Sequence, residues 1–206
     1  MNIYLIRHGE KEDSDKNHET VRMTEKGFMQ ADRLGKRLKQ RNAIDKIYSS
    51  PMIRAVQTAE TINKHLGVEL EVRDEIREIH MGDCEQLGWA YFEKTYPDFL
   101  EKTRNQDQDL RYPPDGENGA DVWERAQSVI WDILDSGDEN VAIVAHGGII
   151  RVIVASLIGL GAHKRFLLEG VEYCSITQLI YDEDSGRFRL KGYNDYAHLL
   201  GGVIHD

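Results

Sequence analysis

The sequence opens its first predicted strand with Ile3-Tyr4-Leu5-Ile6-Arg7-His8-Gly9-Glu10, and this stretch decides the fold class. Its first four residues are apolar, as in a strand buried within a sheet, and polar residues begin where that strand would end. The pattern returns at residues 141–145, which are fully apolar and precede His146-Gly147-Gly148. Ligands of open α/β sheets bind beyond the carboxyl ends of the strands. Both His-Gly pairs are therefore predicted at one ligand-binding edge.

Strand and helix patterns alternate through the rest of the chain. Thr24 is typical of a helix N-cap, and Ser50-Pro51 predicts the start of a second helix that ends at Gly67. Further helices are predicted over 122–134 and 149–157, and strands over 46–50, 69–72, 175–181 and 187–193. A hairpin-like turn separates the last two strands. Such alternation indicates an α/β layered domain.

The pattern weakens over residues 81–118. Aromatic residues between Trp89 and Phe99 predict a helix, and the polar residues 105–115 contain Pro113-Pro114. We interpret 81–118 as an excursion, a cap-like segment of one domain that spans residues 1–206.

Composition limits the partners. The chain of 206 residues has a formal net charge of -10, which opposes binding to nucleic acid and to anionic membranes. An anionic ligand therefore needs a local cluster of positive charge. The apolar stretch before Arg7 is too short for a signal peptide, and Cys84 and Cys174 form no CxxC pair, so we expect a cytoplasmic protein. No spacing of histidines predicts a metal site.

Four motifs carry a family resemblance when they are taken together and in order. They are Ile6-Arg7-His8-Gly9-Glu10, the run from Ser49 to Ala59, Arg77-Glu78-Ile79-His80-Met81-Gly82, and Ala145-His146-Gly147-Gly148. The set resembles the histidine phosphatase superfamily, whose best-known branch is the cofactor-dependent phosphoglycerate mutases. The resemblance extends from Asn2 to about Ile158 and includes residues 23–27. It implies a three-layer α/β/α sandwich with a mostly parallel central sheet, as in the phosphoglycerate mutases.

The resemblance also implies roles for the catalytic residues. His8 matches the nucleophile, and a neutral imidazole nitrogen suits that role near pH 7. His146 matches the second histidine of the phosphate pocket, where we expect it to be protonated beside a dianion. Glu78 matches the general acid, which protonates the departing oxygen and later accepts a proton from water.

Phosphate binding is assigned to Arg7, Arg54, His146 and Gly147. Guanidinium groups fit phosphate oxygens and stay charged, and a glycine lets its backbone NH approach a ligand closely. The chain departs from the family where a Thr and an Asn are common, because it has Lys11 and Ser14 there. We therefore expect an altered substrate choice, with Ser14, Arg104 and Arg111 as candidate substrate contacts.

The sequence thus predicts a metal-independent phosphatase that hydrolyses small phosphorylated metabolites through a phosphohistidine at His8. It predicts no cofactor, and either a monomer or a homodimer. Two alternatives stay open. One is a phosphoglycerate mutase, a phosphotransferase that keeps the same intermediate from water. The other is a non-catalytic module that binds an anion or a phosphoprotein.

Overall fold

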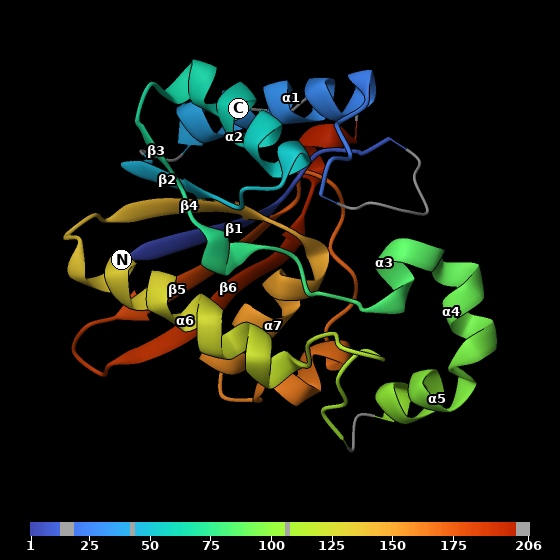
Figure 1. Ribbon diagram of the computed structural model, residues 1–206. Coiled ribbons are helices and arrows are strands. Elements are labelled where there is room, and N and C mark those ends of the chain that lie inside the picture. The colour runs from blue at the N-terminus through green and yellow to red at the C-terminus, as the bar shows by residue number, and fades with distance from the viewer. Residues whose placement is uncertain (13–18, 42–43, 106–107, 201–206) are drawn as a thin grey trace.

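A single six-stranded sheet organises the described part of the chain, which comprises residues 1–12, 19–41, 44–105 and 108–200 of the computed structural model (Figure 1). The strands are β1 (Asn2–Arg7), β2 (Lys46–Ser49), β3 (Glu69–Val72), β4 (Asn140–Ala145), β5 (Ile176–Asp182) and β6 (Arg187–Asp195). Their order is β3-β2-β4-β1-β5-β6. The first four strands in this order run parallel, whereas β5 is antiparallel to both β1 and β6. The predicted mostly parallel sheet is confirmed.

Helices cover both faces of the sheet. Helices α1 (Glu25–Arg41) and α2 (Ile53–Leu66) lie on one face, and α6 (Gly119–Asp135) and α7 (Gly147–Leu157) on the other (Figure 1). The side chains of β1 alternate between the two apolar cores. Ile3 and Leu5 pack in the core that contains α6 and α7, and Tyr4 and Ile6 pack in the core that contains α1 and α2. The three-layer α/β/α sandwich is confirmed.

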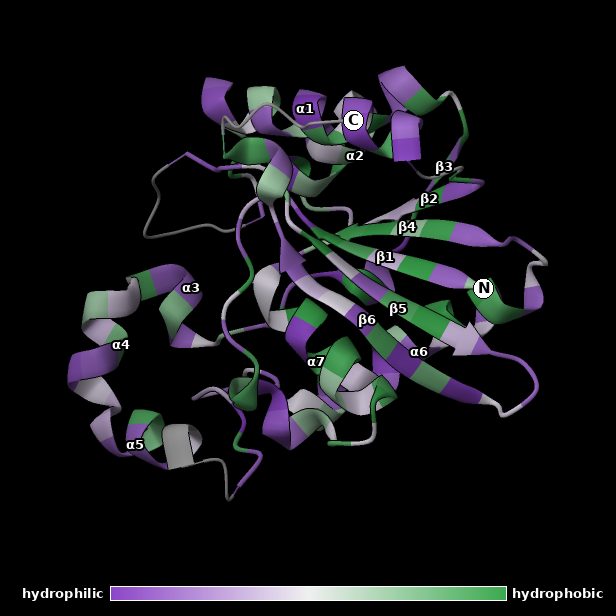
Figure 2. Cartoon of the chain, turned by 180° about the vertical axis from the view of Figure 1, so that it is seen from behind, coloured by the Kyte–Doolittle hydropathy of each residue, from purple (hydrophilic) through white to green (hydrophobic). Residues whose placement is uncertain are grey.

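Hydropathy follows these layers. The central strands are mostly apolar along their length, and the outward faces of the helices are polar (Figure 2). This is the pattern of parallel strands that are covered on both faces. None of the described helices combines the length and the apolar character that crossing a membrane requires.

Helix ends show which local signals were reliable. The hydroxyl of Thr24 accepts a hydrogen bond from the amide of Gly27 at 3.0 Å, so the predicted N-cap of α1 is confirmed. Gly67 ends α2 in the left-handed region with φ of 70°. The predicted start of α2 at Ser50 and Pro51 is wrong, because the helix begins at Ile53. The amide of Ser50 instead donates to Val144, which extends the sheet ladder past β2.

The excursion, residues 81–118, lies outside the sandwich and carries three short helices (Figure 1). They are α3 (Asp83–Leu87), α4 (Trp89–Thr95) and α5 (Pro97–Asn105). The prediction of one helix from Trp89 to Phe99 is wrong, because α4 ends before Tyr96. Tyr96 precedes Pro97, and helical torsions are unfavourable for a residue in that position. The ring of Phe92 contacts those of Phe99 and Tyr112 and fixes the helices to one another.

Candidate active site

The two predicted histidines meet at the carboxyl edge of the sheet. Strands β1 and β4 are parallel neighbours, and Arg7 stands opposite Ala145 in their register. The next residues, His8 and His146, therefore leave the sheet side by side. Their ring centroids are 5.1 Å apart, and the amide of His8 donates to the carbonyl of Ala145 at 3.0 Å. The fold thus brings together two imidazoles from segments that are far apart in sequence.

The hydrogen bonds of His8 fix its tautomer. Its Nδ1 lies 2.8 Å from the carbonyl oxygen of Gly9, which can only accept, so Nδ1 carries the proton. Its Nε2 accepts from Nε of Arg54 at 3.1 Å. Burial lowers the pKa of His8 well below its ordinary value, and the charges of Arg54 and Arg7 lower it further. His8 is therefore neutral at pH 7, with the lone pair on Nε2.

Arg54 lies in the first turn of α2 and is only 2% exposed. Burial lowers the pKa of its guanidinium, and the Glu78 carboxylate opposes that shift. Thr58, one turn further along α2, donates to the carbonyl of Arg54 at 2.7 Å and accepts from the amide of Gly9 at 3.0 Å. Helix α2 and the loop after β1 are therefore tied together beside His8.

His146 lies fully buried behind His8. Its Nε2 is 2.7 Å from the hydroxyl of Ser50, and its Nδ1 has no hydrogen-bond partner within the described residues. Burial lowers the pKa of His146 well below its ordinary value, and the charge of Arg54 adds to the effect. The imidazole is therefore neutral at pH 7 in the free protein, and the protonated form expected beside a bound dianion stays a prediction. A phosphate dianion beside it would raise its pKa again.

Glu78 lies against the first turn of α7. Its carboxylate accepts from the amides of Gly148 and Ile149, each at 3.0 Å. A Cβ atom at Gly148 would lie 2.6 Å from Oε1 of Glu78, so a larger residue there would displace the carboxylate from its present position. Arg125 on α6 donates to the carbonyl of Glu78 at 3.2 Å and holds its backbone in place. The carboxyl group is thus fixed at the same edge as the histidines.

Arg7 is held by a segment that the motifs do not include. Its Nη1 donates to the carbonyl of Val171 at 2.5 Å, and its guanidinium carbon lies 3.9 Å from the ring centroid of Tyr173. Its buried Nε has no hydrogen-bond partner among the residues that the structure describes. The carbonyl of Arg7 also accepts from the amide of Cys174 at 3.0 Å. The segment between α7 and β5 therefore completes one wall of the site.

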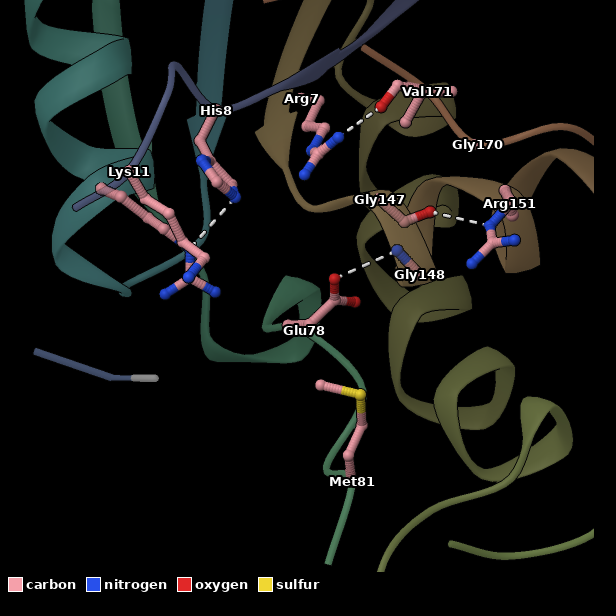
Figure 3. Close-up of a pocket in the computed structure, with 11 residues that line it drawn as sticks. Arg7, His8, Lys11, Glu78, Met81, Gly147, Gly148, Arg151, Gly170 and Val171 are labelled. Atoms are coloured by element: carbon pink, nitrogen blue, oxygen red, sulfur yellow. Dashed lines mark hydrogen bonds between the residues drawn. The ribbon is translucent and has the colours of Figure 1, made fainter. Parts of the chain in front are cut away.

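Arg7, His8, Arg54 and Glu78 line a cavity of about 280 Å³ (Figure 3). His146 lies behind His8 and is not part of this lining. The lining includes four cationic residues, namely Arg7, Lys11, Arg54 and Arg151, against the single carboxylate of Glu78. His8, Met81, Gly147, Gly148, Gly170 and Val171 complete the lining. The net charge of -10 required a local cluster of positive charge for any anionic ligand, and this cavity contains such a cluster.

The three candidate substrate contacts lie apart from this group. Ser14 falls outside the described residues, as does the side chain of Arg104. Arg111 is largely exposed, and it pairs with Asp121 on α6 at 2.5 Å and does not line the cavity.

The comparison with family models decides the family. A model described as the histidine phosphatase superfamily (branch 1) matches residues 3–195. The chain belongs to the histidine phosphatase superfamily. The resemblance drawn from the four motifs is confirmed. The prediction of a phosphoric monoester hydrolase is confirmed as well. Enzymes of this superfamily act through a phosphohistidine intermediate.

Named relatives of this histidine phosphatase include other phosphatases. The protein named "Putative phosphoserine phosphatase 2" of Hydrogenobacter thermophilus is 34% identical over 86% of this chain and 88% of its own length. The glucosyl-3-phosphoglycerate phosphatase of Mycobacterium tuberculosis is 30% identical over 77% of each chain. The structure of a mycobacterial glucosyl-3-phosphoglycerate phosphatase with inorganic phosphate matches with a TM-score of 0.85 and 26% identity, over 96% of this chain and 98% of that one.

Sequence reasoning about this histidine phosphatase missed Arg151 and Tyr173. Arg151 follows Gly147 by four residues on α7, and residues so spaced share a helix face, so the sequence did contain a signal. Tyr173 lies in an irregular segment without periodicity, where no pattern indicates contact with Arg7. The structure also explains the motif at residues 23–27. A Cβ atom at Gly27 would lie 2.3 Å from the carbonyl oxygen of Glu10, so the loop after β1 packs directly on α1.

Proposed function

We propose that Nε2 of His8 is the phosphoryl acceptor of a metal-independent phosphatase that acts on small phosphomonoesters. The observation that carries this assignment is the hydrogen bond from Nδ1 of His8 to the carbonyl of Gly9. It leaves the lone pair on Nε2, which faces the guanidinium of Arg54 beside the cationic cavity. A neutral imidazole with that lone pair is the nucleophilic form.

The first step transfers the phosphoryl group to the enzyme. Nε2 of His8 attacks phosphorus as the bond from phosphorus to the ester oxygen breaks, and Glu78, protonated for this step, gives its proton to that oxygen. Arg7 and Arg54 bind the phosphate oxygens, and the backbone at Gly147 and the imidazole of His146 add donors to them. The products are a free alcohol and a phosphohistidine.

The second step returns the enzyme to its starting form. A water molecule attacks the phosphohistidine, Glu78 takes a proton from it, and the bond from phosphorus to Nε2 breaks. Inorganic phosphate leaves, His8 is neutral again, and a proton from water has replaced the one that Glu78 gave to the ester oxygen. Because guanidinium and ammonium groups supply the positive charge, we expect turnover to persist when metal ions are chelated.

The relatives and the cavity support small metabolites as substrates. Two relatives have names that refer to small phosphorylated molecules, phosphoserine and glucosyl-3-phosphoglycerate. The cavity of about 280 Å³ is slightly smaller than the usual range for ligand sites, roughly 300–1,000 Å³. A single domain over residues 1–206, active in the cytoplasm as a monomer or homodimer, completes the proposal. Cys84 and Cys174, both buried and unpaired, are compatible with that compartment.

Rapid-quench trapping tests the assignment. The protein, in chelator, is mixed with a phosphomonoester for milliseconds, quenched under alkaline conditions that preserve phosphohistidine, digested and sequenced by mass spectrometry. We expect the phosphoryl group on His8 and a matching release of inorganic phosphate. A phosphoryl group on another residue, or hydrolysis only after metal is added, would falsify the assignment. Turnover of 3-phosphoglycerate that requires a bisphosphoglycerate primer would identify a mutase instead.

A further inference from the structure

The cavity contains more positive charge than one phosphate group needs. A phosphate dianion is matched by Arg7 and Arg54, which lie beside His8. Arg151 adds a further permanent positive charge to the same cavity. Among the described residues, no carboxylate pairs with Arg151. A ligand with a second negative charge would therefore balance the cavity better than a phosphate group alone.

Arg151 is placed close to the phosphate position. Its Nε donates to the carbonyl of Gly147 at 3.3 Å, one helical turn back along α7, or about 6 Å along the axis. Gly147 also contacts Arg7, since a Cβ atom there would lie 3.7 Å from Nε of Arg7. In Figure 3, Arg7 lies between His8 and Arg151. The two guanidinium groups thus flank the same glycine, within the span of one small molecule.

Two contacts hold the guanidinium of Arg151 in position. The bond to Gly147 orients its Nε, and the ring of Phe166 lies 5.1 Å from its central carbon. Both Nη groups remain available for a ligand, because no described residue bonds to them. A guanidinium fixed in this way binds a carboxylate through two parallel hydrogen bonds.

The rest of the lining narrows the ligand class. None of the described lining residues is a tryptophan, tyrosine or phenylalanine on which a nucleobase could stack, and none carries an amide or hydroxyl side chain to recognise a sugar. With a volume of about 280 Å³, the cavity favours a compact molecule whose recognition depends on charge.

We propose that Arg151 forms a second anion subsite, which binds a carboxylate carried by the phosphorylated substrate. The preferred substrates are then phosphomonoesters of small hydroxy or amino acids. This inference rests on the proposed function, because it places the phosphate group of the substrate beside His8.

Matched substrate pairs test the subsite. O-phosphoserine carries a carboxylate that O-phosphoethanolamine lacks. 3-Phosphoglycerate carries a carboxylate where glycerol 3-phosphate has a hydroxymethyl group. For each pair, kcat/KM is measured for the wild type, for Arg151→Ala and Arg151→Lys, and for Arg189→Ala as a control from the exposed edge of the sheet. For the wild type, we expect kcat/KM to be at least about tenfold higher for the substrate with the carboxylate than for its partner without one. Arg151→Ala should reduce that ratio about ten- to a hundredfold, the size of one charge-assisted interaction, and Arg151→Lys should restore part of it.

The outcomes separate the two proposals. The subsite is overturned if the wild-type ratio of kcat/KM values is near one. It is also overturned if Arg151→Ala lowers kcat/KM equally for both members of a pair. In both cases the phosphatase function stands. If no phosphomonoester is hydrolysed, the proposed function fails. Calorimetric titration of the same pairs into the His8→Ala variant, which cannot be phosphorylated at this position, then gives the ratio of the two Kd values in each pair. Tighter binding of the acid that depends on Arg151 supports the subsite, and equal binding overturns it.

Discussion

The carboxyl edge of the sheet and the excursion differ in how they are held. At the edge, His8, Arg54 and His146 are nearly inaccessible, and strand ends or a helix start fix their backbones. The excursion is three short helices around a few aromatic rings, and it leaves Trp89 and Tyr91 more than two-fifths exposed. Met81 is its only contribution to the described lining of the cavity.

Catalysis and tolerance to substitution therefore belong to different regions of the molecule. Groups that must keep a set protonation state and geometry are attached to the most buried strands. The buried rings of the excursion belong to the core that contains α6 and α7, and only Met81 reaches the described lining of the cavity, so substitutions in the excursion should change stability more than phosphoryl transfer. Three substitutions and a pH titration test that separation, in decreasing order of expected effect.

Replacing the proposed nucleophile should have the largest effect. We expect His8→Ala to reduce kcat/KM for any phosphomonoester by about 10⁴-fold or more, because no other neutral imidazole in the cavity presents its lone pair to the substrate. Steady-state phosphate release measures the loss, and circular dichroism checks the fold. Full activity in this variant would place the chemistry elsewhere.

Phe92 tests the excursion. Its ring is fully buried among Phe99 and Tyr112, so Phe92→Ala should lower the free energy of unfolding by about 3–5 kcal/mol. Below the unfolding transition, hydrolysis of p-nitrophenyl phosphate should stay within about threefold of the wild type. Denaturant unfolding and initial rates give both quantities. A large loss of activity at unchanged stability would show that the excursion takes part in catalysis.

Acid should destabilise the sandwich rather than the excursion, which contains no histidine. Burial, helped by Arg37, lowers the pKa of His198 to about 4. The unfolded chain takes up this proton near pH 6.5 and the folded chain does not, so stability is full above pH 6.5 and falls as pH drops toward 4. His198 alone should lower the free energy of unfolding by about 2 kcal/mol between pH 7 and pH 5.

The measurement compares the wild type with His198→Gln. Glutamine keeps an acceptor for Arg37 but does not titrate, so its free energy of unfolding should fall less steeply with acid. Identical pH slopes in the two proteins would contradict the assignment to His198. His8 and His146 should add destabilisation of the same sign in both, since burial lowers the pKa of each.

The smallest effect is expected at the surface of the excursion. Trp89 stacks on Phe92 but is 43% exposed, and its indole donates to Glu93 at 2.8 Å. Trp89→Ala should change the free energy of unfolding by less than about 1 kcal/mol and leave kcat unchanged. Thermal unfolding and a rate assay are sufficient. A change in KM confined to large substrates would show that this surface contacts them.

The sequence predicted the layers because strand and helix periodicities are local properties. It also predicted which residues gather at the edge, since residues that follow parallel neighbouring strands must meet there, as Arg7 and Ala145 do in register. Local signals failed where a distant partner decided the outcome. Ser50 has the chemistry of a helix cap, but the ladder to Val144 and the contact with His146 hold it in an extended segment.

Other features had no local signal. Tyr173 contacts Arg7 only because β5 lies next to β1, an order that no short pattern encodes. Likewise, the break at Tyr96 was readable from Pro97, but the packing of Phe92 on Tyr112 depends on how the excursion folds back. Periodicity therefore predicts elements and edges, whereas the walls of the cavity depend on the three-dimensional order of the strands.

The position of β1 and β4 inside the sheet has a consequence for hydrogen exchange. Both strands have a neighbour on each side and a core on each face, and the amide of His8 bonds to Ala145 as an extension of that ladder. Amides of this kind exchange with deuterium only when the whole domain unfolds, whereas short peripheral helices exchange through smaller openings. The His8 amide should therefore belong to the slowest class of exchanging sites, and transient opening of the excursion should leave the reactive edge intact.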